Sequence, residues 1–287
     1  MIQVPPQFQL PHPFEYPEHN SIIFEDWYFR NWQPEDAKHR TYLPVLWTSY
    51  YCANRYGLAR REMHELQSFV SHLDRSKKYY TIVQYDNGIL TNLRGLDIKV
   101  FAMSGPKIDY PLPLTAQPHP YEFDEPRNIL ASFTGAQTHM IRRQMYRWFK
   151  SRQGFHFSFK KTDCYEFCQT LARSVFALCP RGYGQTSFRL VEALQYGAIP
   201  VYISDQHIIP HNANFDYGLL IRPEGLRGIE SKLRKMSPEE IKDLQDKGKI
   251  AYNELFSYEG CKKRILECLE FQDGFCSDTP VQHSISL

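Results

Sequence analysis

The chain has 287 residues, of which 42% are hydrophobic and 15% aromatic, enough for two domains with cores of their own. Its 34 basic and 32 acidic residues give a formal net charge of +2, which argues against a nucleic-acid-binding protein. No apolar run approaches the roughly 20 residues that a membrane span needs, and the N-terminus lacks a signal-peptide pattern.

The cysteine content indicates the cellular compartment. There are seven, an odd number, and no Cys-x-x-Cys pair occurs among them, which is typical of free thiols in a reducing compartment. Cys164 and Cys168 lie one helical turn apart, and we interpret them as neighbours on a helix rather than as half of a zinc site. We therefore expect a soluble, cytoplasmic protein without a membrane anchor.

The first part of the chain alternates predicted strands with a predicted helix. The strands cover residues 41–47, 79–85 and 97–103, and the helix covers residues 62–73. Pro44 interrupts the first strand, which places that strand at a sheet edge. Asp86, Asn87 and Gly88 form a turn signal directly after the second strand. This alternation predicts an α/β domain over residues 1–110.

Prolines crowd residues 111–127, which we interpret as an interdomain linker. A second α/β domain is expected over residues 128–287, because a strand at 128–134, a turn at Gly135 and a helix at 140–149 follow in order. Arg142 and Arg143 fall in the first turn of that helix.

A second strand–turn–helix corner follows in the same domain. An apolar run from Ser174 leads to a turn with Gly182 and Gly184, and a helix is predicted between Ser187 and Gly197. Exposed backbone N–H groups at such a turn suit a diphosphate. Arg189 would supply positive charge there and Glu192 would accept hydrogen bonds from ribose hydroxyls. The alternative is a plain salt bridge between these two side chains on an ordinary βαβ unit.

The same run carries a resemblance to a known family. The matching residues are Cys179, Pro180, Gly182, Gly184, Ser187, Arg189, Leu190, Glu192, Ala193, Leu194, Gly197, Ile199, Pro200 and Val201. In this order they resemble the signature of exostosin-like glycosyltransferases of family GT47, and the Phe-x-Gly and Ile-Arg pairs of residues 133–142 match as well. The resemblance covers most of residues 22–270 and is strongest over 128–205.

The resemblance implies an α/β fold of the GT-B type, with two Rossmann-like domains that face a central cleft. It implies inverting transfer of a sugar from a UDP-sugar, with UDP-xylose as one candidate, to a hydroxyl group of an oligosaccharide or glycoprotein glycan. Animal and plant relatives usually carry a membrane anchor, and this chain is expected to be a compact, anchorless form. A catalytically silent glycan-binding module is the alternative, and an α/β enzyme acting on another nucleotide, such as a phosphorylase or epimerase, is a third.

The expected donor site contains residues from both corners. They are Gly135, Thr138, Arg142, Arg143, Arg181, Gly182, Tyr183, Ser187, Arg189 and Glu192. No Asp-x-Asp sequence occurs, so we expect no metal and no other cofactor, with arginines offsetting the charge of the leaving group. Asp86 is the first candidate for the catalytic base, with a plain turn-forming role as its alternative, and Glu25 and Asp26 are the other candidates.

Overall fold

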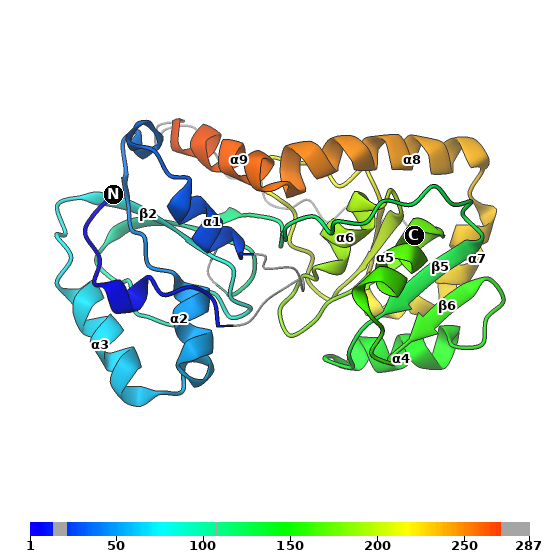
Figure 1. The fold of residues 1–287 in the computed structure, drawn as a ribbon, viewed down its shortest axis with the longest axis horizontal. Coiled ribbons are helices and arrows are strands. Elements are labelled where there is room, and N and C mark those ends of the chain that lie inside the picture. The colour runs from blue at the N-terminus through cyan, green and yellow to red at the C-terminus, as the bar shows by residue number, and fades with distance from the viewer. Residues whose placement is uncertain (14–21, 107, 271–287) are drawn as a thin grey trace.

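A computed structural model of the chain describes residues 1–13, 22–106 and 108–270, and the end of the second predicted domain lies beyond them. Figure 1 shows two α/β units side by side. Helices α8 (Pro238–Ala251) and α9 (Tyr258–Glu270) run along one edge of both units. The expected fold class, α/β with two Rossmann-like domains of the GT-B type, is confirmed by the two parallel sheets described below.

The first unit is built on a four-stranded parallel sheet with the strand order β1-β2-β3-β4. Its strands are β1 (Thr41–Tyr42), β2 (Lys78–Val83), β3 (Asp97–Ala102) and β4 (Tyr110–Pro111). Its helices are α1 (Phe24–Arg30), α2 (Trp47–Ala53) and α3 (Arg60–Ser71). In β2 every residue after Lys78 is buried, as expected of a strand covered on both faces.

The predicted strand over residues 41–47 is wrong beyond its first two residues. After Tyr42 only one further backbone contact, from Leu43 N to the Tyr80 carbonyl, continues the pairing, and Pro44 has no N–H to donate. The chain then turns into α2 at Trp47, whose indole N–H donates to Thr81 Oγ1 at 2.7 Å. This residue therefore joins the core from a helix rather than from a strand.

The second unit is a five-stranded parallel sheet with the order β6-β5-β7-β8-β9. Its strands are β5 (Ile129–Thr134), β6 (Phe155–Ser158), β7 (Ser174–Pro180), β8 (Ile199–Ile203) and β9 (Leu219–Ile221). Its helices are α4 (Met140–Phe149), α5 (Cys164–Ala172), α6 (Arg189–Gln195) and α7 (Ile229–Lys235). Helices α4 and α7 pack on one face, and α5 and α6 on the other.

Residues 112–128 contain no helix or strand and carry the chain from the first sheet to the second. Helix α8 starts with the predicted capping box, in which the Ser237 and Glu240 side chains exchange hydrogen bonds with each other's backbone N–H groups. After it, α9 returns to the first unit, where Ile265 is buried with Phe24 and Tyr28 of α1. Within the described ranges, no helix combines the length and apolar character that a membrane crossing requires.

Shorter turns connect these elements. They are 3₁₀ turns at Pro6–Phe8, Pro34–Ala37, Arg55–Gly57 and Pro223–Gly228 and a π turn at Tyr252–Phe256. No disulfide joins the six cysteines of the described residues, and Cys276 lies outside them.

Candidate functional site

The two predicted corners meet because β5 and β7 are neighbours in the sheet. The strand order of this sheet is the 2-1-3-4-5 arrangement, which reverses between its first and third strands, β5 and β7. In such sheets ligands bind at this switch point, outside the carboxyl ends of the two strands. Arg142 of α4 ties the corners together. It donates to the carbonyl oxygens of Ala136 at 2.9 Å, Pro180 at 3.2 Å and Arg181 at 3.0 Å, and it is buried.

Both corner glycines lie against guanidinium groups. A Cβ atom at Gly135 would lie 3.3 Å from Arg189 Nη2, and one at Gly182 would lie 3.3 Å from Arg142 Nη2 and 3.7 Å from Thr138 Oγ1. The two distances of 3.3 Å are tighter than most Cβ contacts, so a larger residue at either glycine would press on the guanidinium group of Arg189 or Arg142. The glycines are therefore explained by close approach rather than by unusual backbone angles.

Arg189 and Glu192 form the predicted pair on α6. Arg189 Nη1 lies 2.6 Å from Glu192 Oε2, Nη2 donates to the Thr134 carbonyl at 2.7 Å, and the guanidinium lies 4.2 Å from the centroid of the Phe167 ring. The buried Arg189 Nε has no hydrogen-bond partner among the described residues. The salt bridge foreseen as the alternative thus exists, and both side chains also line a pocket.

That pocket has a volume of about 500 Å³ and opens at the carboxyl ends of β5 and β6, on the face covered by α5 and α6. We call it the switch-point pocket. It is lined by His119, Thr134, Gly135, Ala136, Phe159, Lys160, Lys161, Thr162, Asp163, Cys164, Phe167, Arg189 and Glu192.

The glycine-rich turn after β7 is held by Arg181. Its Nη1 lies 2.5 Å from Asp205 Oδ1, and its other nitrogens donate to the carbonyls of Tyr183 and Gly184. Burial opposes ionisation of Asp205, but the hydrogen bond and charge of Arg181 outweigh it and lower the pKa of that carboxyl. The Tyr183 side chain is 74% exposed, so it stands on the surface beside the turn.

Three other predicted donor residues lie near the corners in different settings. Ser187 is buried, and its Oγ accepts a hydrogen bond from Arg189 N at 3.3 Å. Helix α6 begins at Arg189, but Phe188 already has helical backbone angles, which fits a helix start near Ser187. Thr138 Oγ1 is buried and has no partner among the described residues. Arg143 is exposed on α4.

Asp86 reaches this region from the other domain. It follows β2, and a Cβ atom at Gly184 would lie 2.7 Å from Asp86 Oδ1 and 2.5 Å from Ser104 Oγ. Ser104 Oγ in turn donates to Gln185 Oε1 at 2.6 Å. Burial raises the pKa of Asp86, against the opposing effects of the Gly184 N–H and the charges of Arg181 and Arg142. The carboxylate therefore lies where the two domains touch.

The other two candidate bases face elsewhere. Glu25 is 1% exposed and accepts hydrogen bonds from Thr48 N at 3.0 Å, from Thr48 Oγ1 and from Gln84 N at 2.5 Å. Burial raises its pKa to about 7, although these hydrogen bonds act in the opposite direction. Asp26 binds Arg30 through both carboxylate oxygens at 2.9 Å. Both therefore have structural partners within the first domain.

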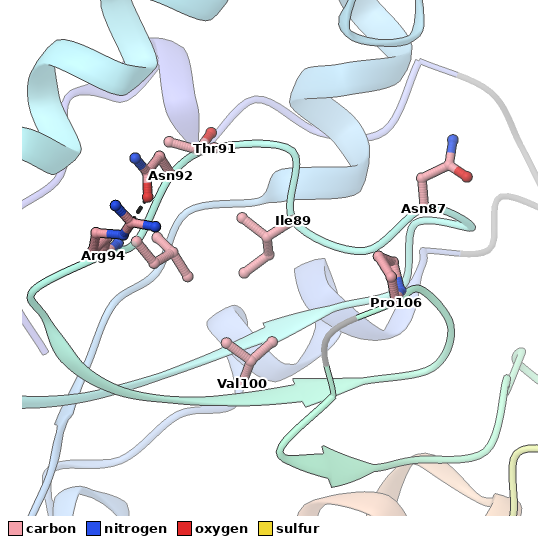
Figure 2. Close-up of a pocket in the computed structure, with 8 residues that line it drawn as sticks. Asn87, Ile89, Thr91, Asn92, Arg94, Val100 and Pro106 are labelled. Carbon is pink, nitrogen blue, oxygen red and sulfur yellow. Dashed lines mark hydrogen bonds between the residues drawn. The ribbon is translucent and has the colours of Figure 1, made fainter.

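A second pocket, of about 360 Å³, begins next to Asp86. Figure 2 shows Asn87 and Pro106 at one end of it and Arg94 at the other, with Ile89 and Val100 between them. This pocket is confined to the first domain and contains no residue of the predicted donor site.

The sequence interpretation missed the part of the switch-point pocket formed by His119 and by residues 159–163. The second group follows β6, a strand that was not predicted. Its signal was present, because Phe155, Phe157 and Phe159 alternate with polar residues as a strand requires. His119 stands among linker prolines, and nothing in its local sequence indicates a pocket.

The sequence profile of the Exostosin GT47 domain matches residues 70–219, just over half of the chain. The match contains Asp86 and both strand–turn–helix corners.

Relatives of known sequence agree with this match. An exostosin-1 homolog of Caenorhabditis elegans is 32% identical over 94 residues, which are 32% of this chain and 25% of the relative. A probable glucuronosyltransferase of Oryza sativa subsp. japonica is 29% identical over 147 residues, which are 46% of this chain and 33% of the relative. A probable beta-1,4-xylosyltransferase of Arabidopsis thaliana is 32% identical over 78 residues, 26% of this chain and 19% of the relative. The matches thus cover a third or less of each relative's length.

Two solved structures are similar over most of this chain. The GtfA/B complex has a TM-score of 0.42 at 10% identity, with 73% of this chain and 60% of that chain covered. TarM has a TM-score of 0.43 at 8% identity, with 73% and 53% covered.

Proposed function

The chain belongs to the exostosin GT47 family of glycosyltransferases, and we propose that it moves a sugar, with inversion, from a UDP-sugar to a hydroxyl group of a glycan acceptor. The observation that carries the proposal is the switch-point pocket, which is lined by Arg189 and Glu192 and lies in the domain whose glycine-rich turn contacts Asp86.

The donor nucleotide is assigned to this pocket. Glu192 is held by Arg189 through Oε2, and a carboxylate oxygen has lone pairs to spare for ribose hydroxyls. From there the diphosphate extends toward Gly135 and Gly182, which lie against the guanidinium groups of Arg189 and Arg142. Arg189 supplies positive charge, and Arg142 fixes the distance between the two corners.

Asp86 is assigned as the base. It takes the proton of the acceptor hydroxyl while the acceptor oxygen forms its bond to the anomeric carbon on the side opposite the diphosphate. The bond from that carbon to the diphosphate breaks, and UDP leaves with the electron pair. A pKa raised by burial makes the Asp86 carboxylate a stronger proton acceptor than an exposed aspartate. Glu25, in contrast, has all its observed partners inside the first domain.

The departing diphosphate needs its charge offset, and arginines are assigned this task without a metal ion. Arg181, Arg142 and Arg189 gather around the two corners, and the chain has no Asp-x-Asp sequence to hold a divalent cation. In a preorganised group of this kind, the loss of one donor lowers the rate by a factor of about 10²–10³.

The donor sugar is proposed as a pentose or a uronic acid, with UDP-xylose first. This choice is supported by the names of two relatives, a probable xylosyltransferase and a probable glucuronosyltransferase. The acceptor is proposed as an oligosaccharide or glycoprotein glycan bound by the first domain, where the pocket of Figure 2 begins beside Asp86.

Thermal unfolding with UDP, GDP, CDP, ADP and UMP tests the donor class. A nucleotide at 100 times its Kd adds about 2.7 kcal/mol to the free energy of unfolding, which moves the midpoint visibly. We expect a shift with UDP that is lost in Arg189→Ala and kept in Arg147→Ala, a matched control on the exposed face of α4. Because Arg189 also pairs with the buried Glu192, Arg189→Lys serves as a variant that keeps the charge.

A UDP shift would justify assays with UDP-xylose and UDP-glucuronic acid. The absence of any nucleotide shift would contradict the donor assignment and would favour a catalytically silent glycan-binding module.

A further inference from the structure

Three metal-ligating side chains meet in the wall of the switch-point pocket. They are His119 of the linker and Cys164 and Cys168 of α5, and their ligand atoms all lie within 4.8 Å of one another. His119 Nδ1 lies 3.2 Å from Cys164 Sγ, which lies 3.9 Å from Cys168 Sγ. His119 and Cys168 are buried, whereas Cys164 is half-buried and lines the pocket.

The fold holds these groups in place from two directions. Cys164 begins α5 and Cys168 follows one turn later, so their thiols share one helix face. The backbone of His119 is clamped by the side-chain amide of Gln195, which accepts from His119 N at 3.1 Å and donates to its carbonyl at 2.8 Å. The cluster is therefore a defined arrangement of two separate segments.

The imidazole is also oriented as a metal ligand is. His119 Nε2 lies 3.5 Å from Glu192 Oε1, an ion-pair distance without a hydrogen bond, and the negative charge of the carboxylate favours the tautomer with its proton on Nε2. Nδ1 then carries the lone pair that faces Cys164 Sγ. A carboxylate behind a histidine ligand is the usual second shell of zinc sites.

Against the expectation from the sequence that Cys164 and Cys168 are only neighbours on a helix, we propose that His119, Cys164 and Cys168 bind one zinc ion, with a fourth position for water or a small ligand at the pocket. Two thiolates and an imidazole are the ligands that zinc prefers, and tetrahedral Zn–S bonds of about 2.3 Å put two sulfur atoms roughly 3.8 Å apart. Binding converts the two thiols to thiolates and releases their two protons to solvent.

The zinc ion would join the linker to α5 beside the nucleotide pocket. This ion would not bind the diphosphate, as the metal ion of other glycosyltransferases does. The charge of the diphosphate remains assigned to the arginines. The inference does not depend on the proposed transferase activity, because zinc binding is measured without nucleotide or acceptor.

The test is cobalt substitution in the whole chain. Protein kept reduced and stripped of metal is titrated with Co²⁺, and we expect one equivalent to produce the intense thiolate-to-cobalt charge-transfer band and the visible bands of a tetrahedral site. One equivalent of Zn²⁺ should remove both. Elemental analysis of the protein before stripping should show zinc bound to the chain.

Cys168→Ser and Cys164→Ser should lose stoichiometric binding, while Cys52→Ser, which changes a thiol in the first domain, should keep it. Glu192→Gln should weaken binding by about 10–100-fold through the second shell. A reduced wild-type chain without the charge-transfer band, or a band unchanged in Cys168→Ser, would overturn the site and leave a plain thiol–imidazole contact. The wild-type titration decides this even if a variant fails to fold.

Discussion

The two sheets of this protein are both parallel, but they differ in strand order. In the first, strands follow one another as β1-β2-β3-β4, whereas in the second β5 lies between β6 and β7. The connections that leave β5 and β7 therefore run in opposite directions, with α4 on one face and α6 on the other. A crevice opens between them.

The different strand orders give the two domains different parts of the candidate site. The sheet with the switch point contains the pocket with Arg189 and Glu192, whereas the sequential sheet presents a carboxylate on the turn after β2. The second domain is thus suited to hold a nucleotide and the first to supply a base. Variants of each domain should therefore separate nucleotide binding from base catalysis, and the largest effect is described first.

The largest effect is expected from Asp86→Asn. Removing a general base costs about 10²–10⁴ in kcat, whereas UDP affinity should stay unchanged because the nucleotide is assigned to the other domain. Initial rates and calorimetric titration with UDP measure the two quantities. Asp74→Asn, at an exposed turn of the same domain, is the control. Near-normal turnover in Asp86→Asn would remove Asp86 from the mechanism.

The pH dependence sharpens the same assignment. The base must be ionised, so kcat/KM should rise with pH through the pKa of Asp86. Because burial raises that pKa above its ordinary value of 3.8, the rise should occur at higher pH than for an exposed aspartate. A pH–rate profile measures this limb. A variant Asp86→Asn that retained the same limb at its residual rate would assign the ionisation to another group.

The next effect concerns stability and belongs to the first domain alone. The folded-state pKa of Glu25 is about 7 and its ordinary value 4.5, so the folded chain holds a proton that the unfolded chain has lost between these pH values. The free energy of unfolding should therefore fall, by about 3 kcal/mol, as pH rises from 4.5 to 7. Urea unfolding of Glu25→Gln should show a smaller fall than wild type or the exposed-site control Glu35→Gln. Equal slopes in all three would contradict the assigned pKa.

A smaller effect is expected where the domains touch. In Gly184→Ala the new methyl group would lie 2.7 Å from Asp86 Oδ1 and 2.5 Å from Ser104 Oγ, so the base or the turn must move. A displacement near 1 Å costs about 10² in kcat, while UDP binding should change little. Gly228→Ala is the matched control, since a Cβ there meets nothing within 4 Å. Unchanged kcat in Gly184→Ala would show that this contact does not set the catalytic geometry.

The smallest effect is expected from divalent cations. If arginines alone offset the charge of the diphosphate, the transfer rate should stay the same when Mg²⁺ or Mn²⁺ is added to the assay. A rate that depends on Mn²⁺ would contradict the metal-free assignment. The zinc site is tested separately, by cobalt titration.

The sequence by itself determined the α/β class, the two corners and the family. These follow from local signals, since the apolar run before Pro180, the glycines of the turn and the spacing of Arg189 and Glu192 lie within one short stretch. Helix α4 was likewise predicted with its observed bounds, because its periodicity and its preceding turn are both local.

Only the tertiary structure decided which distant residues meet. Strand order brings β5 beside β7, domain packing brings Asp86 against Gly184, and the linker brings His119 to the thiols of α5. Each of these contacts joins residues separated by dozens of positions, and their geometry is set by how sheets and helices pack rather than by local sequence. For the same reason Glu25, adjacent to Asp26 in the chain, is a buried partner of Thr48 and Gln84, whereas Asp26 pairs with Arg30.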